Sequence, residues 1–192
     1  MTDIAGYTYD QELPTSPVSR AELDLLLATL LWTEEDATAL RIAGSVLDSR
    51  IEEVLDLWYG YVASHPHLVA SFTGADGQPS GPYLDAVRAR FGQWIRDLCS
   101  RPWDQQWLNY QHEIARRHTD SMGSTDHVTS DQTHIPLRYL IAFIWPITAT
   151  LRQFLSDQGH SQAEVDAMHA AWFKAVTLTV ALWAQPYQPN RW

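Results

Sequence analysis

The sequence predicts an all-α protein, and two observations support this prediction. Apolar side chains recur at intervals of three and four residues along most of the chain, and few stretches show the alternation that strands require. Three expected helix starts also carry a capping box, in which a Ser or Thr is followed three residues later by an acidic residue. These pairs are Ser19 with Glu22, Thr33 with Asp36, and Ser161 with Glu164.

The expected elements are helices joined by polar connections. Residues 73–82 and 119–132 are rich in Gly, Ser, Asp and Thr and are expected to be loops, whereas 1–18 and 186–192 are expected to be Pro-containing arms. No repeat or linker divides the chain, so its length predicts one all-α globular domain over residues 1–192. We expect helices at residues 19–31, 33–48, 50–64, 80–99, 104–118, 135–157 and 161–184.

The helix expected at 135–157 is apolar on every side, which is typical of a helix without a solvent-facing stripe. It therefore either runs through the centre of the molecule or also packs on a partner subunit. Pro146 predicts a kink within it. The apolar residues are Tyr139, Leu140, Ile141, Ala142, Phe143, Ile144, Trp145 and Ile147.

Charge and composition argue against several classes of function. The formal net charge is −10, the arginines are scattered, and Lys174 is the only lysine, so binding to nucleic acid or to an anionic membrane is not expected. Cys99 is the only cysteine, so no internal disulfide and no thiolate zinc or iron–sulfur site can form.

No targeting or membrane segment is expected. The N-terminus lacks a signal pattern. The longest uncharged apolar run, Tyr139–Leu151, has 13 residues, whereas a membrane span needs about 20. We therefore expect a soluble, cytoplasmic protein.

The stretch 111-QHEIARRHTD-120 contains two histidines that cannot share one metal ion. A zinc-protease helix needs histidines four residues apart. His112 and His118 are six apart, which turns them about 120° away from each other around a helix. The chain also lacks the Glu-x-x-His pairs of a di-iron bundle.

Helical phase separates the two histidines. Trp107, Tyr110, Ile114 and His118 form one apolar stripe, so His118 is expected to face inward at the end of its helix. His112 and its neighbour Glu113 lie off the stripe and are expected at the surface. His118 then has two interpretations: a buried histidine bonded to backbone, or the single axial ligand of a haem iron.

Two other helices offer candidate walls for such a site. Trp58 and Tyr59 are adjacent and place two polar hydrogens on apolar rings, for which a diatomic ligand or an ordinary backbone group would be an acceptor. The helix at 80–99 carries an apolar stripe without histidine or carboxylate. Arg88 and Arg90 flank this stripe, where they either reach haem propionates or stay solvated.

The sequence resembles the protoglobins, single-domain haem globins related to the globin-coupled sensors. The resemblance runs from 6-GYTYD-10 to 181-ALWAQPY-187. It implies a globin fold, a three-over-three helical sandwich with an additional N-terminal helix, and it implies haem b. The most specific segments are 55-LDLWYGYVASHPHL-68, 104-DQQWLNYQHEIARRH-118, 134-HIPLRYLIAFIWPITAT-150 and 171-AWFKAVTLTVALW-183.

The resemblance also implies roles for individual residues. His118 matches the proximal iron ligand, in agreement with the stripe, and Trp58 and Tyr59 match the distal pair. Val87 stands where many globins carry a distal histidine. Family members form homodimers through their late helices, which fits the apolar helix at 135–157. The expected cofactor-binding residues are Trp58, Tyr59, Val87, Arg90, Phe91, Ile114, His118, Leu140, Phe143 and Ile147.

Four functions remain open at this stage. The first is reversible binding of O2, CO or NO at a five-coordinate haem iron. The second is a haem enzyme acting on peroxide, nitrite or NO, or transferring carbenes in engineered form. This ranks lower because the sequence offers no distal His–Arg pair for peroxide cleavage. The third is a sensor module, which would need a separate partner because the chain ends at Trp192. The fourth is a helical protein that binds no haem.

Overall fold

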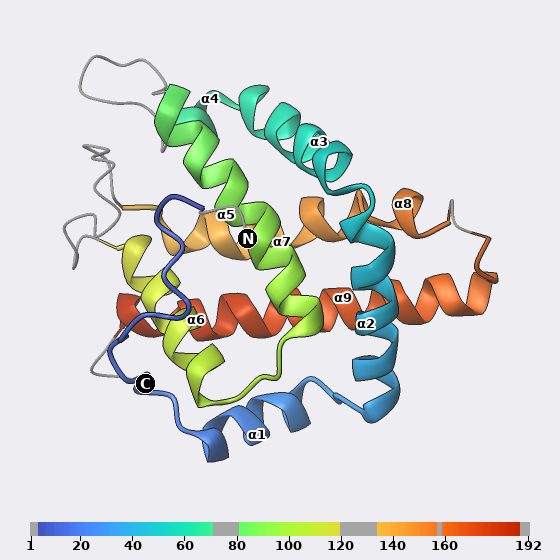
Figure 1. Cartoon of the computed structure of the whole chain (residues 1–192), viewed down its shortest axis with the longest axis horizontal. Helices are drawn as coiled ribbons and strands as arrows, with labels where there is room; N and C mark the ends of the chain where they lie inside the picture. Colours follow the sequence, from blue (N-terminus) through green and yellow to red (C-terminus); the bar gives the residue numbers. More distant parts are fainter. Residues whose placement is uncertain (1–3, 71–80, 120–133, 157–158, 189–192) are drawn as a thin grey trace.

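The computed structural model describes residues 4–70, 81–119, 134–156 and 159–188 (Figure 1). Within these ranges the chain is helical and contains no strand. The two expected loops lie outside the described residues except at their edges. The elements are α1 (Arg20–Thr29), α2 (Glu34–Asp48), α3 (Ile51–Ala63), α4 (Pro66–Val69), α5 (Gly81–Ser100), α6 (Gln105–Arg117), α7 (Leu137–Ala149), α8 (Arg152–Ser156), α9 (Gln162–Trp183) and the 3-10 turn η2 (Gln185–Tyr187).

The three capping boxes are confirmed. In the first, the Ser19 hydroxyl accepts from the Glu22 amide, while the Glu22 carboxylate accepts from the Ser19 amide at 2.7 Å. The starts of α2 and α9 repeat this arrangement. Each box satisfies two backbone N–H groups that a helix start leaves without partners, so these helices begin for local reasons.

The helix expected at 135–157 is wrong as a single element, because it forms two helices, α7 and α8. The interruption falls at Thr150 and Leu151, whereas Pro146 lies inside α7. The carbonyl of Pro146 accepts from both the Thr150 amide at 3.2 Å and the Thr150 hydroxyl at 2.6 Å. A threonine side chain that bonds back to the preceding turn competes with helix continuation, and hydrophobic periodicity does not reveal it.

Two short elements, α4 and η2, were not expected from the sequence. Both α4 and η2 have a proline in their first two positions, Pro66 and Pro186. Proline is favourable there because its missing N–H would have had no helical partner. The turn η2 occupies part of what was expected to be a C-terminal arm.

The N-terminal arm is packed against the helices. Tyr9 is buried, and the Arg101 guanidinium lies 3.6 Å from the centre of its ring. Beside it, the Tyr7 hydroxyl donates to the buried Asp97 carboxylate at 2.7 Å, and Arg101 pairs with the same carboxylate at 2.9 Å. Asp97 lies in the last turn of α5 and Arg101 directly follows that helix, so these contacts fix the N-terminal arm to α5.

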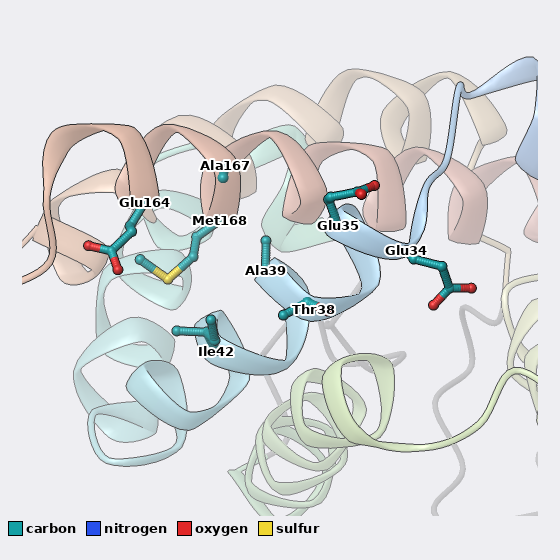
Figure 2. A pocket seen from close by; sticks show the side chains of 8 residues that line it. All are labelled: Glu34, Glu35, Thr38, Ala39, Ile42, Glu164, Ala167 and Met168. Atoms are coloured by element: carbon teal, nitrogen blue, oxygen red, sulfur yellow. The ribbon is translucent and has the colours of Figure 1, made fainter.

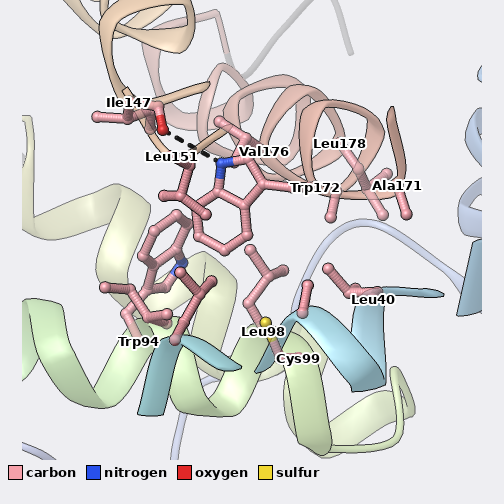
Figure 3. Packing of buried hydrophobic residues seen from close by; sticks show 14 of the residues in the cluster. Leu40, Trp94, Leu98, Cys99, Ile147, Leu151, Ala171, Trp172, Val176 and Leu178 are labelled. Atoms are coloured by element: carbon pink, nitrogen blue, oxygen red, sulfur yellow. Dashed lines mark hydrogen bonds between the residues drawn. The ribbon is translucent and has the colours of Figure 1, made fainter. Parts of the chain in front are cut away.

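The core is centred on α9, which packs on α2, α6, α7 and α8. In Figure 1, α9 runs across the molecule behind α5. Figure 3 shows how Trp172 of α9 fits between Trp94, Leu98 and Leu151. Its indole N–H donates to the carbonyl of Ile147 at 3.3 Å, so a large ring is buried with its polar group satisfied.

The helix α7 has an exposed apolar face. Trp145 is 70% exposed and Ile141 is 54% exposed, so the expectation that this helix runs buried on all sides through the centre is wrong. The alternative, packing on a partner subunit, remains open. Among the described residues, no helix combines the length and the apolar character needed to cross a membrane.

The crossing of α2 and α5 requires a residue without a side chain. A Cβ added to Gly44 would lie 2.4 Å from the Cβ of Cys99, which real structures do not tolerate. Cys99 is buried, so it cannot move aside into solvent. The two helices therefore approach each other as closely as they do because position 44 is glycine.

We predict that Gly44→Ala destabilises the protein. The added methyl group must push the two helices apart, at a cost of about 1–3 kcal/mol in the free energy of unfolding. The measurement is urea unfolding followed by circular dichroism. Gly60→Ala on α3 is the control, because its added Cβ meets nothing within 4 Å and alanine favours a helix by roughly 0.5–1 kcal/mol. Equal effects of the two substitutions would contradict this account.

Candidate functional site

The helix α6 ends at the histidine that the sequence singles out. It starts at Asp104, whose carboxylate accepts from the Trp107 amide at 3.0 Å, and His118 is its C-cap residue. Trp107 and Tyr110 of the expected stripe are buried, and Ile114 is partly buried and packs on the core. The amphipathic pattern therefore aims the end of α6, and His118 with it, at the interior.

The imidazole of His118 is held in a neutral form. Loss of solvation lowers its pKa to about 4, the charges of Arg117 and Arg90 act in the same direction, and the backbone of Ile114 opposes the shift. Its Nδ1 atom is buried without a hydrogen bond of standard geometry, although the backbone of Ile114, one turn earlier on α6, is close enough to the ring to act on its pKa. A metal ion binds histidine in its neutral form, through the lone pair of one ring nitrogen.

Both the ring and the backbone of His118 contact the C-terminal end of the chain. The Trp183 ring lies 4.9 Å from the imidazole ring, and its N–H donates to Gln111 of α6 at 3.0 Å. The His118 carbonyl accepts from the Ile135 amide at 2.9 Å and from the Tyr187 hydroxyl at 3.1 Å. No local sequence pattern predicts Trp183, Ile135 and Tyr187 as neighbours of His118, since only the tertiary fold brings them to α6.

Glu113 is not a surface residue, so that expectation is wrong. Its side chain is 4% exposed and pairs with Arg117 at 3.0 Å and with Arg116 at 3.7 Å. His112 is partly buried, and loss of solvation lowers its pKa. Both His112 and His118 are partly buried, because the N-terminal arm packs on the side of α6 that would otherwise face solvent.

The expected distal residues Trp58 and Tyr59 have different roles in the fold. Trp58 is almost fully buried, and its N–H donates to the Thr150 hydroxyl at 2.8 Å. Its polar hydrogen is therefore used within the protein. Tyr59 is partly buried, and burial raises the pKa of its phenol, so it stays a neutral hydrogen-bond donor at physiological pH.

A continuous set of aromatic rings joins this region to His118. Phe91 lies 5.0 Å from Trp58 and 5.4 Å from Trp94 between ring centres. Trp94 in turn lies 6.0 Å from Trp183, the ring that contacts His118. The residues expected to lie on two faces of one cofactor are thus brought to the same part of the interior.

The two arginines on α5 have distinct partners. Arg88 bridges to α3, with Glu52 at 2.7 Å and Asp56 at 2.8 Å. Arg90 donates to the carbonyl of Ala5 in the N-terminal arm at 3.3 Å. The positive charge of Arg90 lowers the pKa of both Tyr59 and His118.

The remaining expected residues lie on α5, α6 and α7 and are buried or partly buried. Ile147 is buried, and its carbonyl accepts from Trp172. Phe143 packs on the core and lies 5.9 Å from the Tyr61 ring. Partly buried positions are Val87, Phe91, Ile114, Leu140 and Phe143.

These residues fit a haem. A single neutral imidazole, an apolar and aromatic lining, and an arginine at the rim are what a protein contributes to a five-coordinate haem iron. The neutral imidazole of His118, packed against Trp183 at the end of α6, is the observation in this structure that favours a ligand; a haem iron would take its Nε2 atom, while the buried Nδ1 atom faces the protein.

A surface groove between the starts of α2 and α9 lies apart from these residues (Figure 2). Its volume is about 320 Å³. Its lining has no histidine and includes none of the expected site residues. The lining residues are Glu34, Glu35, Thr38, Ala39, Ile42, Glu164, Ala167 and Met168.

Comparisons with known proteins identify the family and the fold. The family model described as Protoglobin matches residues 19–192. Among solved structures, the globin domain of the Geobacter sulfurreducens globin-coupled sensor is similar, with a TM-score of 0.66 and 16% sequence identity over 86% of this chain and 97% of that chain. At this identity the likeness establishes the fold alone. No curated protein matches the chain. Globin membership implies haem binding in general, and the chain belongs to the protoglobin family, with the all-α globin fold that the sequence predicts.

Proposed function

We propose that this chain is a haem b protein that binds O2, CO and NO reversibly, with His118 as the proximal ligand of a five-coordinate iron. The observation that carries the proposal is the imidazole of His118, which loss of solvation keeps neutral and which stands at the end of α6 against the Trp183 ring. Bound haem supplies a ferrous iron with one open position for a diatomic ligand. The proposal treats residues 1–192 as one haem domain.

The chain's own residues hold and shield the cofactor. Phe91, Phe143 and Ile114 provide apolar contact area and keep water away from the iron side of the pocket. Arg90 lies at the rim, where its charge suits a propionate. The other cofactor contacts in the proposal are Val87, Leu140 and Ile147.

Tyr59 is the proposed hydrogen-bond donor to O2 on the distal side. Its phenol lies on α3 beside the proposed cofactor contact Trp58, and burial keeps it neutral, so it is able to donate. Trp58 shapes the pocket with its ring instead, because its N–H is already bonded to Thr150. A donor of this kind favours O2 over CO, since bound O2 carries more negative charge.

Gas binding ranks above a dedicated haem enzyme. Peroxide cleavage needs a positioned acid–base pair on the distal side. Val87 is apolar, and the nearby Arg88 is engaged by two carboxylates of α3. Peroxide, nitrite or NO chemistry would use the same open iron position without help from these two residues.

We also propose that the protein forms a homodimer through α7 and α9. Trp145 and Ile141 on α7, and Phe173 on α9, are large apolar residues that solvent reaches. The proposal rests on these residues belonging to two helices that pack on each other, so that they can contribute to one apolar interface. The single cysteine, Cys99, is a free thiol, which fits a reducing compartment, and we propose a cytoplasmic location.

The proximal assignment predicts that His118→Ala loses haem. Removal of the iron ligand should weaken haem affinity by roughly tenfold or more, because the metal–imidazole bond contributes well over 1.4 kcal/mol. The measurement is haem content and the Soret spectrum of the purified protein. His112→Ala on the same helix is the control and should keep both. An unchanged spectrum in His118→Ala would show that His118 is not the ligand.

The distal assignment predicts that Tyr59→Phe releases O2 faster. Loss of one hydrogen bond of roughly 1 kcal/mol should raise the O2 dissociation rate about fivefold, with a smaller effect on CO. Stopped-flow kinetics with both gases measure this difference. Tyr61→Phe, on the same helix but more exposed, should change neither rate. Equal small changes for O2 and CO in Tyr59→Phe would rule out the donor role.

The dimer proposal predicts that Trp145→Glu yields a monomer. A charge on the apolar face of α7 leaves an unpaired carboxylate in the interface, which opposes association. Sedimentation velocity measures the oligomeric state. Leu25→Glu, a comparably exposed position on α1 (69% against 70% for Trp145), is the matched control. A dimer that survives Trp145→Glu would place the interface elsewhere.

A further inference from the structure

One tyrosine hydroxyl joins three distant parts of the chain at the iron-ligand position. The Tyr187 hydroxyl lies within hydrogen-bond distance of the carbonyl oxygens of both His118 and Ile135, at 3.1 Å from the former. The Ile135 amide also donates to the His118 carbonyl at 2.9 Å. A hydroxyl has a single hydrogen, so Tyr187 shares it between two acceptors and draws both backbones toward η2.

The same C-terminal stretch also contacts the imidazole ring. Trp183 lies four residues before Tyr187, and its ring is tilted against His118 at 4.9 Å. The indole N–H is fixed by the buried Gln111 of α6 at 3.0 Å. The ring of His118 is therefore held by the end of α9, and its backbone is held by η2.

These contacts leave the imidazole few ways to move. Ring packing against Trp183 restricts the side-chain torsions of His118. If the imidazole moved along the proposed bond to iron, the backbone of residue 118 would have to move with it. That backbone is bonded to Ile135 and Tyr187, so the displacement passes to η2.

We propose that Tyr187 is a positioning residue for His118, and that its hydroxyl couples the C-terminal turn Gln185–Tyr187 to the iron–imidazole bond. The proposal rests on the proposed function, because it takes His118 as the iron ligand. The coupling acts in both directions, as linkage requires: a change at the distal side that shifts His118 alters η2, and a constraint on η2 alters ligand affinity. The turn is well suited to this role because Gln185 is buried and anchors it.

The test is Tyr187→Phe in the full-length, haem-loaded protein. This substitution keeps the ring, which packs on His134 at 5.8 Å, and removes only the hydroxyl. We expect haem content to stay at wild-type stoichiometry, because His118 is intact. We expect the iron–histidine stretching band of the ferrous protein, measured by resonance Raman spectroscopy, to shift by several wavenumbers. The dissociation rates of O2 and CO should change together by about two- to fivefold, the effect of one lost hydrogen bond.

A second readout uses the haem-free protein. Hydrogen exchange at the Ile135 amide should be faster in Tyr187→Phe, because the hydroxyl that holds its acceptor in place is gone. Tyr139→Phe on α7 is the matched control: this tyrosine contacts His67 and Arg138 and should change neither the Raman band nor the exchange of Ile135.

The outcomes separate this proposal from the proposed function. A Tyr187→Phe protein that is less stable but keeps the wild-type Raman band and gas kinetics shows a purely structural tyrosine and overturns the positioning role. Loss of haem binding in wild-type protein, or its retention in His118→Ala, instead overturns the assignment of His118. A shift that affects O2 alone would indicate a distal effect and would also contradict the coupling.

Discussion

The neutral, partly buried imidazole of His118 at the end of α6 is the point on which the contacts of the surrounding structure converge. Loss of solvation lowers the pKa of His118, and nearby arginine charges lower it further. An imidazole kept neutral in this way retains the lone pair that a metal ligand needs. The aromatic rings that bury it, Trp183 and then Trp94, also form the wall that continues to Trp58 and Phe91.

The chain ends stabilise the helix that carries this imidazole. Arg117, the residue before His118, donates to the Gly6 carbonyl at 2.7 Å and the Thr8 hydroxyl at 2.9 Å. It also pairs with the buried Glu113 carboxylate. A buried carboxylate is tolerable only when it is paired and hydrogen-bonded, so the arm, Arg117 and Glu113 form one unit. Together with Tyr187, they fix α6 from both termini of the chain.

Residues whose environment is local could be predicted from sequence, and those with distant partners could not. The capping box at Ser19 needs only neighbours three residues away, and the inward face of His118 follows from the spacing of Trp107, Tyr110 and Ile114. Glu113 looked like a surface residue because periodicity says nothing about an N-terminal arm that folds back over α6. The interruption at Thr150 was missed because its hydroxyl is shared between the Pro146 carbonyl and the Trp58 indole, which belongs to another helix.

The sequence by itself determined the all-α class, most helix starts and the direction in which the apolar face of α6 points, because these depend on propensity, capping and helical phase. The tertiary structure decided which groups surround that histidine. It brought Trp183 and Tyr187 to His118, engaged the N–H of Trp58 with Thr150, and left Trp145 exposed on α7. Such pairings join residues far apart along the chain, and their free energy depends on packing that no local pattern encodes.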